Sequence, residues 1–204
     1  MGERHKADDR RDEIVEAARE LCEERGLSHT TIKDIADRVG VTRSLFYHYF
    51  PDKDSVLDAV LDDIVADFLV DLEEWNRLRD PGNIDRALND LIVLFRDRVF
   101  ETTSFRRSLV SRENASLYTR FVYRVSDGAA KFLIDNTVRD LRRYHNIEIE
   151  SAYETFYILI AGMISYVRSH PSAELDVLQG IVAHTLGVDR YVPNMQSVDV
   201  EGAF

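Results

Sequence analysis

Apolar residues in this chain recur three and four positions apart in almost every interval between helix-breaking residues, whereas strict alternation is not seen. This spacing puts the apolar side chains on one face of an α-helix and is not typical of β-strands. The 204 residues include only 9 Gly and 4 Pro, so few positions interrupt the pattern. We therefore predict an all-α fold, with helices at about residues 8–25, 31–39, 42–49, 52–79, 84–100, 104–112, 114–145, 151–169 and 174–187.

The composition is that of a globular protein. The chain is 45% hydrophobic and 31% charged, which is typical of neither disordered nor fibrous proteins. Its single cysteine, Cys22, can form no internal disulfide and no cysteine-based zinc site. The apolar stretch at 156–167 is shorter than the roughly 20 residues that span a bilayer, and residues 1–12 lack the apolar segment of a signal peptide. We expect a cytoplasmic protein that does not enter a membrane.

Two short helices joined by a glycine turn are predicted between residues 30 and 50. Thr31 and Asp34 form the T-x-x-D pattern of a capping box, which begins a helix. Gly40 supplies a left-handed residue that ends this helix, and Thr42 is suited to cap the next one. The pattern predicts a helix-turn-helix, a motif whose second helix can enter the major groove of DNA.

The second of these helices has two different faces on a wheel of about 100° per residue. Its hydrogen-bonding side chains share one arc: Arg43, Tyr47, Ser44 and His48. Its apolar and other aromatic side chains fall on the opposite half: Leu45, Phe46, Tyr49 and Phe50. The first set can contact base edges and phosphates while the second set packs. The alternative is that the aromatic run is only a core cluster on an amphipathic helix.

The charge distribution agrees with a local DNA-binding surface. The net charge of −11 argues against a general nucleic-acid coat. Residues 26–53 nevertheless carry a net charge of +1, since four basic residues face three acidic ones: Lys33, Arg38, Arg43 and Lys53 against Asp34, Asp37 and Asp52. A sequence-specific reader needs positive charge only where it touches the duplex.

Residues 31–53 resemble the N-terminal signature of the TetR family of bacterial transcriptional repressors, in which Thr, Ile-Ala, Gly-Val-Thr, an aromatic run and Lys follow at fixed spacing. The likeness is strong over about residues 10–60 and elsewhere extends only to length and helicity. It implies a repressor that a small molecule releases from a palindromic operator. It also implies that eight residues face DNA: Thr31, Lys33, Thr42, Arg43, Ser44, Tyr47, His48 and Lys53. Leu45 stands where the family often has threonine, and we expect this departure to affect packing more than recognition.

The lengths of the predicted helices indicate a domain boundary. The first three helices are short and closely spaced, whereas those after Asp52 are long. We predict a helix-turn-helix DNA-binding domain at residues 1–52, with the family signature running on to about residue 70. We predict a helical ligand-binding and dimerisation domain at residues 53–204.

The helix at 151–169 is apolar nearly all the way round, so one buried stripe within its own domain would leave another exposed. Paired with the helix at 174–187 and with the same two helices of a second copy, it could form an intersubunit four-helix bundle. Dimerisation through the last two major helices is also what the resemblance implies. The residues assigned to this interface are Phe156, Ile160, Gly162, Ile164, Leu178 and Val182. The alternative is a central core helix in a monomer.

Aromatic residues on the helices after Asp52 are candidates for an effector site, because the resemblance places an effector cavity among these helices. They are Phe68, Trp75, Phe95, Phe105, Phe121, Tyr123, Tyr153 and Tyr157. The alternative is that each belongs to the core, since aromatic residues at helical spacing commonly do. We expect a largely apolar small-molecule effector and no cofactor; the sequence does not identify the effector.

Residues 96–124 carry seven arginines against three acidic residues, a net charge of +4. Three roles are open for them: binding an anionic effector, lying on a solvated surface, or pairing with the acidic residues 8–24, whose net charge is −5. In the third case, Arg106 and Arg107 are the residues expected to link effector binding to DNA binding.

Catalytic and metal-binding patterns are weak. The acids at Asp62, Asp63 and Asp67 lack the i, i+1, i+4 spacing of a helical magnesium site, so a solvated helix face is the better interpretation. His145 and Glu148 would need a helix to continue through Asn146 in order to share a metal ion. We predict no enzyme and no metal site. A regulator that binds another protein instead of a small molecule remains an alternative.

Overall fold

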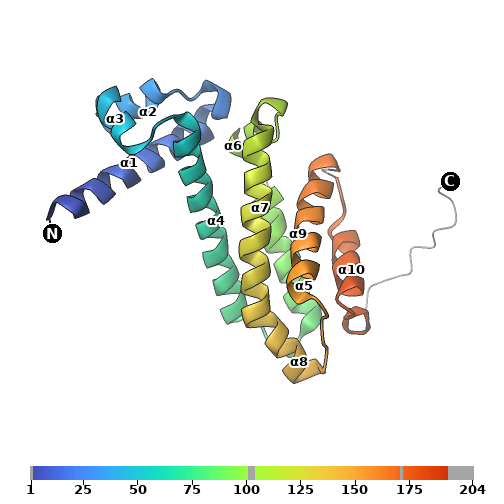
Figure 1. The fold of residues 1–204 in the computed structure, drawn as a ribbon. Helices are drawn as coiled ribbons and strands as arrows, with labels where there is room; N and C mark the ends of the chain where they lie inside the picture. The colour runs from blue at the N-terminus through green and yellow to red at the C-terminus, as the bar shows by residue number, and fades with distance from the viewer. Residues whose placement is uncertain (1, 101–103, 171, 193–204) are drawn as a thin grey trace. The chain divides into compact units, whose positions relative to one another are not determined.

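The computed structural model describes residues 2–100, 104–170 and 172–192 (Figure 1). Within these residues every regular element is a helix and no strand occurs, so the predicted all-α fold is confirmed. None of the described helices is long and apolar enough to cross a membrane. The chain divides into two compact units, Met1–Phe68 with Glu101–Val125, and Leu69–Phe100 with Ser126–Phe204. The domain boundary between residues 52 and 53 stays a prediction.

The first unit combines the N-terminal helices with a later segment of the chain. Its elements are α1 (Gly2–Arg25), the 3₁₀-helix η1 (Leu27–His29), α2 (Ile32–Val39), α3 (Arg43–Tyr49), the first part of α4 (Lys53–Leu78), α6 (Ser104–Leu109), the 3₁₀-helix η3 (Arg112–Asn114) and the first part of α7 (Ala115–Leu133). α1 packs against α2 and α6, and α2 packs against α3. α1 begins at Gly2, earlier than the predicted start near residue 8.

The core of the first unit holds α3 in place. Ile14, Ala18 and Leu21 recur three or four positions apart along α1, and all three are buried. Ile35 of α2 and Phe46 of α3 are buried as well. Burying a side chain of this size contributes about 1.5–3 kcal/mol relative to exposing it. The orientation of α3 within this unit is therefore set by apolar packing, which leaves its other faces available for binding.

The second unit contains the remaining helices. They are the rest of α4 and α7, α5 (Ile84–Phe95), the π-helix η2 (Arg96–Phe100), the π-helix η4 (Ile134–Val138), α8 (Arg139–His145), α9 (Ala152–Ser169), α10 (Leu175–Thr185) and the 3₁₀-helix η5 (Asp189–Tyr191). α5 packs against α10, and α9 contacts both η2 and η4. The helices predicted at 84–100 and 114–145 therefore each contain a π-helical turn, which apolar spacing did not reveal.

Candidate nucleic-acid interface

α2 begins and ends at the residues that the sequence predicts. The Thr31 hydroxyl oxygen accepts a hydrogen bond from the Asp34 backbone N–H at 3.2 Å, and the Asp34 carboxylate accepts one from the Thr31 N–H at 3.0 Å. Hydrogen bonds from the Thr31 side chain and backbone lower the pKa of Asp34 below its ordinary value. Gly40 ends the helix with φ at 73°, in the left-handed region that favours glycine. The capping box and the glycine turn are confirmed.

α3 is held by one cap and two aromatic side chains. The Leu45 N–H donates to Thr42 Oγ1 at 3.2 Å, which confirms the predicted cap. Phe46 and Phe50 are both buried, and their ring centroids lie 5.9 Å apart. Arg11 of α1 places its guanidinium over the Phe50 ring, 5.1 Å from the centroid. Because α3 packs through this narrow aromatic stripe, most of its circumference stays exposed.

The four side chains predicted to face DNA from α3 are all exposed: Arg43, Ser44, Tyr47 and His48. Leu45 is exposed as well, with 38% of its surface accessible. The placement of Leu45 on the packing half of the helix is therefore wrong. Phe46 and Phe50 define the buried direction, and Leu45 lies about 120° away from it on the wheel.

Two basic residues of the predicted surface contact other parts of the fold. Arg38 pairs with Glu20 at 3.0 Å and with Glu24 at 2.8 Å, both on α1. The half-buried Lys53 donates from Nζ to the Leu27 carbonyl oxygen at 2.5 Å. These contacts join elements that are distant in the sequence, so local patterns could not show them. Arg38 and Lys53 therefore help to hold the first unit together.

Lys33 and Arg43 are exposed and make no ion pair or side-chain hydrogen bond within the described part of the chain. Thr31 and Thr42 are exposed too, but their hydroxyl groups are occupied by the helix caps. Of the eight residues predicted to face DNA, the two with a freely available positive charge are thus Lys33 and Arg43. Both belong to the helix-turn-helix.

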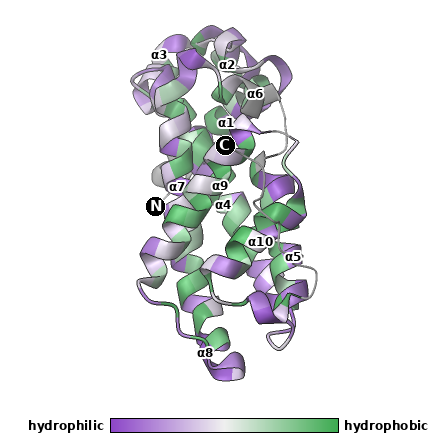
Figure 2. Ribbon diagram, turned by 90° about the vertical axis from the view of Figure 1, so that its right-hand side faces the viewer, coloured by the Kyte–Doolittle hydropathy of each residue, from purple (hydrophilic) through white to green (hydrophobic). Residues whose placement is uncertain are grey.

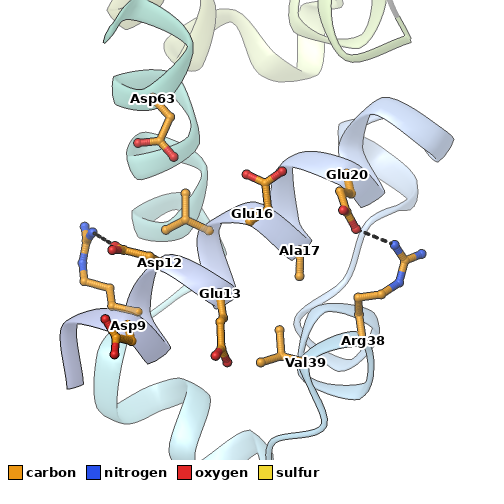
Figure 3. A pocket seen from close by; sticks show the side chains of 11 residues that line it. Asp9, Asp12, Glu13, Glu16, Ala17, Glu20, Arg38, Val39 and Asp63 are labelled. Atoms are coloured by element: carbon orange, nitrogen blue, oxygen red, sulfur yellow. Dashed lines mark hydrogen bonds and ion pairs between the residues drawn. The ribbon is translucent and has the colours of Figure 1, made fainter. Parts of the chain in front are cut away.

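An acidic groove lies elsewhere on the first unit, between α1, α2 and α4 (Figure 3). Its volume is about 920 Å³. Six carboxylates line it, those of Asp9, Asp12, Glu13, Glu16, Glu20 and Asp63. The two arginines that line it, Arg11 and Arg38, lie near carboxylates, Arg11 at 3.9 Å from Asp12 and Arg38 bound to Glu20 and Glu24. Phosphates are repelled from such a surface, so the polar face of α3 remains the candidate DNA contact.

A family model described as bacterial regulatory proteins of the tetR family matches residues 14–60, which run from α1 through the helix-turn-helix into α4. Residues 14–60 thus form a TetR-type DNA-binding domain. BetI of Escherichia coli, an HTH-type transcriptional regulator, is 26% identical over 152 residues, covering 74% of this chain and 77% of BetI. The chain is thus similar to HTH-type transcriptional regulators, and the matched part contains its helix-turn-helix.

Solved structures share the fold. RolR, in a complex with resorcinol, superposes with a TM-score of 0.64 at 19% identity, covering 92% of this chain and 93% of RolR. AlkX, a TetR-family repressor from Dietzia sp. implicated in the biodegradation of n-alkanes, gives a TM-score of 0.64 at 21% identity, covering 89% of this chain and 96% of AlkX. At these identities the likeness concerns the fold alone.

The aromatic residues predicted to bind an effector are distributed over both units and differ in exposure. Phe68, Phe105 and Phe121 of the first unit are buried, as is Phe95 of the second, whereas Tyr123 is 56% exposed.

The other three, Trp75, Tyr153 and Tyr157, are half-buried in the second unit. Trp75 Nε1 donates to the Ala87 carbonyl at 3.2 Å, and the Tyr153 hydroxyl donates to Asp127 Oδ1 at 2.9 Å. The Trp75 N–H and the Tyr153 hydroxyl thus already have hydrogen-bond partners within the chain. Effector binding by the eight aromatic residues stays a prediction.

The residues predicted for a dimer interface are mostly buried within one chain. Phe156, Ile160, Ile164, Leu178 and Val182 are all buried, and of the six only Gly162 is exposed.

Other apolar residues of the same helices are exposed, and they recur four positions apart. On α9 they are Ile158 and Tyr166, 68% and 42% exposed, with Gly162 midway between them; on α10 they are Val177 and Ile181, 43% and 47% exposed. α10 is coloured largely as hydrophobic in Figure 2. Five of the six residues predicted for the interface are therefore part of the core of one chain, and the assignment of α9 and α10 to a dimer interface stays a prediction.

Several arginines of residues 96–124 form ion pairs. None of the pairs that the structure describes involves an acidic residue of α1. Arg120 lies 2.9 Å from Asp58 of α4, and Arg124 lies 3.1 Å from Asp58 and 3.2 Å from Asp62. Arg98 pairs with Asp71 of α4 at 2.9 Å.

The partners of these three arginines are therefore aspartates of α4, whereas Arg96 pairs with Asp97 beside it. None of the four makes the predicted pair with α1. α1 itself reaches α4 through Arg19, which lies 2.7 Å from Asp67. The side chains of Arg106 and Arg107 lie outside the described residues.

Proposed function

We propose that the chain is a TetR-family repressor that binds a palindromic operator as a homodimer and leaves it when a small molecule binds. The observation that carries the proposal is the exposed polar face of α3, on a helix fixed by a cap and a buried aromatic pair. Arg43 at its first turn can bind a guanine edge with two hydrogen bonds. Lys33 can neutralise a phosphate. Such a repressor would act in the cytoplasm, where bacterial DNA is found.

The palindromic form of the proposed operator follows from the two-fold symmetry of the proposed dimer. The stripe Ile158, Gly162 and Tyr166 on α9, with Val177 and Ile181 on α10, is an apolar surface that one chain leaves exposed. Apart from the backbone around Gly162 itself, no atom of the described residues lies within 4 Å of a Cβ built there, so another helix could approach closely. A two-fold dimer through this surface would carry two α3 helices, and such dimers bind inverted half-sites one helical turn or a multiple of it apart.

The effector that we propose is small and largely apolar. RolR holds resorcinol, and AlkX is implicated in n-alkane biodegradation. Proteins of this fold are thus associated with small, largely apolar compounds. The ion pairs of Asp58 with Arg120 and Arg124 join α4 to α7 in the first unit, and both helices continue into the second. We expect these two helices to carry an effector-induced change to the DNA-binding unit, with the coupling of about 1–3 kcal/mol that is typical of allosteric proteins.

Selection of bound duplexes from a random DNA library tests the proposal. We expect an inverted repeat to be enriched. A panel that includes resorcinol and a medium-chain alkane should then contain a compound that lowers binding to this repeat in a fluorescence anisotropy titration. Enrichment of no repeat contradicts operator recognition. Release by a co-purifying protein, with no response to any small molecule, favours a protein partner instead.

A further inference from the structure

Leu45 is an apolar side chain on the outward face of the helix that we assign to DNA reading. It exposes 38% of its surface, whereas Phe46 and Phe50 on the same helix are buried. The outward direction of α3 is opposite these two phenylalanines, and Leu45 lies about 60° from it at 100° per residue. By the same geometry Tyr47 lies about 100° from the outward direction, so Leu45 is nearer the centre of the exposed face.

A leucine in this position can recognise only one feature of the major groove. Its side chain neither donates nor accepts hydrogen bonds, so it leaves any polar base edge that it covers without a partner, which is unfavourable. Thymine alone among the four bases presents a methyl group in the major groove. Ser44, which precedes it on the exposed face, is small and leaves room for α3 to approach the base pairs closely.

We propose that Leu45 contacts the C5-methyl group of a thymine in each operator half-site and is a specificity-determining residue. The inference rests on the proposed role of α3 as the reading helix. It replaces the sequence-based expectation that leucine at this position matters mainly for packing. An exposed leucine would thus gain apolar contact on DNA binding that it lacks in the free protein.

Replacement of thymine by uracil tests this contact, because it removes only the methyl group. Each thymine of the selected repeat is replaced in turn by deoxyuridine, and affinities are measured by fluorescence anisotropy. For the unmodified protein we expect one thymine per half-site at which the change weakens binding about fourfold, the effect of losing contact with one methyl group. Leu45→Ala should bind the thymine and uracil duplexes equally well. Leu78→Ala, which changes a leucine that is 67% exposed at the end of α4, is the matched control and should keep the preference.

The possible results separate this inference from the proposed function. A selected repeat in which no uracil replacement weakens binding overturns the leucine contact and leaves the repressor proposal standing. A thymine preference that persists in Leu45→Ala also overturns it. If no DNA sequence is enriched at all, both the operator proposal and the leucine contact are wrong.

Discussion

Arg43 lies at the first turn of α3, exposed and without an ion pair or hydrogen bond among the described residues. Its guanidinium is therefore free to form two hydrogen bonds with the O6 and N7 atoms of a guanine. We expect Arg43→Ala to lower operator affinity by about 1–3 kcal/mol and to relax base preference at one position of each half-site. Gel-shift titrations against the operator and its single-base variants measure both effects.

Lys33→Ala is the matched comparison, because Lys33 is an equally exposed cation that belongs to α2 instead of α3. A phosphate contact should weaken binding to all sequences alike and reduce the slope of log affinity against log salt by about 1. Arg43→Ala with unchanged affinity and base preference would show that α3 does not read the operator.

Lys53 should affect folding as well as DNA binding. Its Nζ donates to the Leu27 carbonyl and so joins the start of α4 to η1. A hydrogen bond to a charged group contributes about 1.5–3 kcal/mol, and partial exposure reduces this, so we expect Lys53→Ala to lower the free energy of unfolding by about 1–2 kcal/mol. Urea denaturation of the variant beside Lys33→Ala measures the difference; equal stability of the two variants would leave Lys53 with a DNA-binding role alone.

At the scale of elements, the turn between α2 and α3 depends on backbone conformation more than on space. Beyond its chain neighbours, a Cβ at Gly40 would meet no atom of the described residues within 4 Å, yet φ at this residue is +73°. We expect Gly40→Ala to destabilise the protein by about 1–2 kcal/mol, since L-residues with a side chain pay that cost in the left-handed region. Thermal unfolding compares it with Gly40→Asn, which tolerates this region and should lose less. An alanine variant as stable as the unmodified protein would contradict the role given to φ.

Local rules predicted those parts of the fold that local sequence determines. The Thr31–Asp34 capping box, the Gly40 turn and the Thr42 cap each involve residues within four positions of one another, and all are confirmed. The approximate positions of the helices could also be predicted, because apolar residues recur at helical spacing within them. The pairs of Arg38 with α1 and of Arg124 with α4 were not, because they join residues far apart in the chain.

The helical wheel misplaced Leu45 for a related reason. It treated every apolar residue of α3 as a packing residue, but the core accommodates only the stripe formed by Phe46 and Phe50. On α9, apolar residues nearly surround the helix, so periodicity could not distinguish buried Ile160 and Ile164 from exposed Ile158. Which face is inward depends on the neighbouring helices, and no single helix encodes it.

At the scale of the whole molecule, the proposed homodimer should depend on the exposed stripe and not on the five buried residues that the sequence analysis assigned to the interface. We expect Ile158→Glu combined with Ile181→Glu to convert a dimer into a folded monomer, because a symmetric interface would bury four carboxylates without partners. Both positions are exposed in one chain, 68% and 47%, so the monomer itself should tolerate the change.

Sedimentation velocity at micromolar concentration, with circular dichroism as the measure of folding, separates this outcome from simple unfolding. Val70→Glu, at a position that is 64% exposed on α4, is the control and should remain dimeric. Ile164→Asp should instead unfold the chain, because Ile164 is 4% exposed and its carboxylate would enter the core. The folded monomer should bind a palindromic operator no better than a single half-site, since the second α3 helix is no longer attached to the first. Sedimentation of the unmodified protein as a monomer, or a double variant that stays dimeric, would show that this stripe is not the subunit interface.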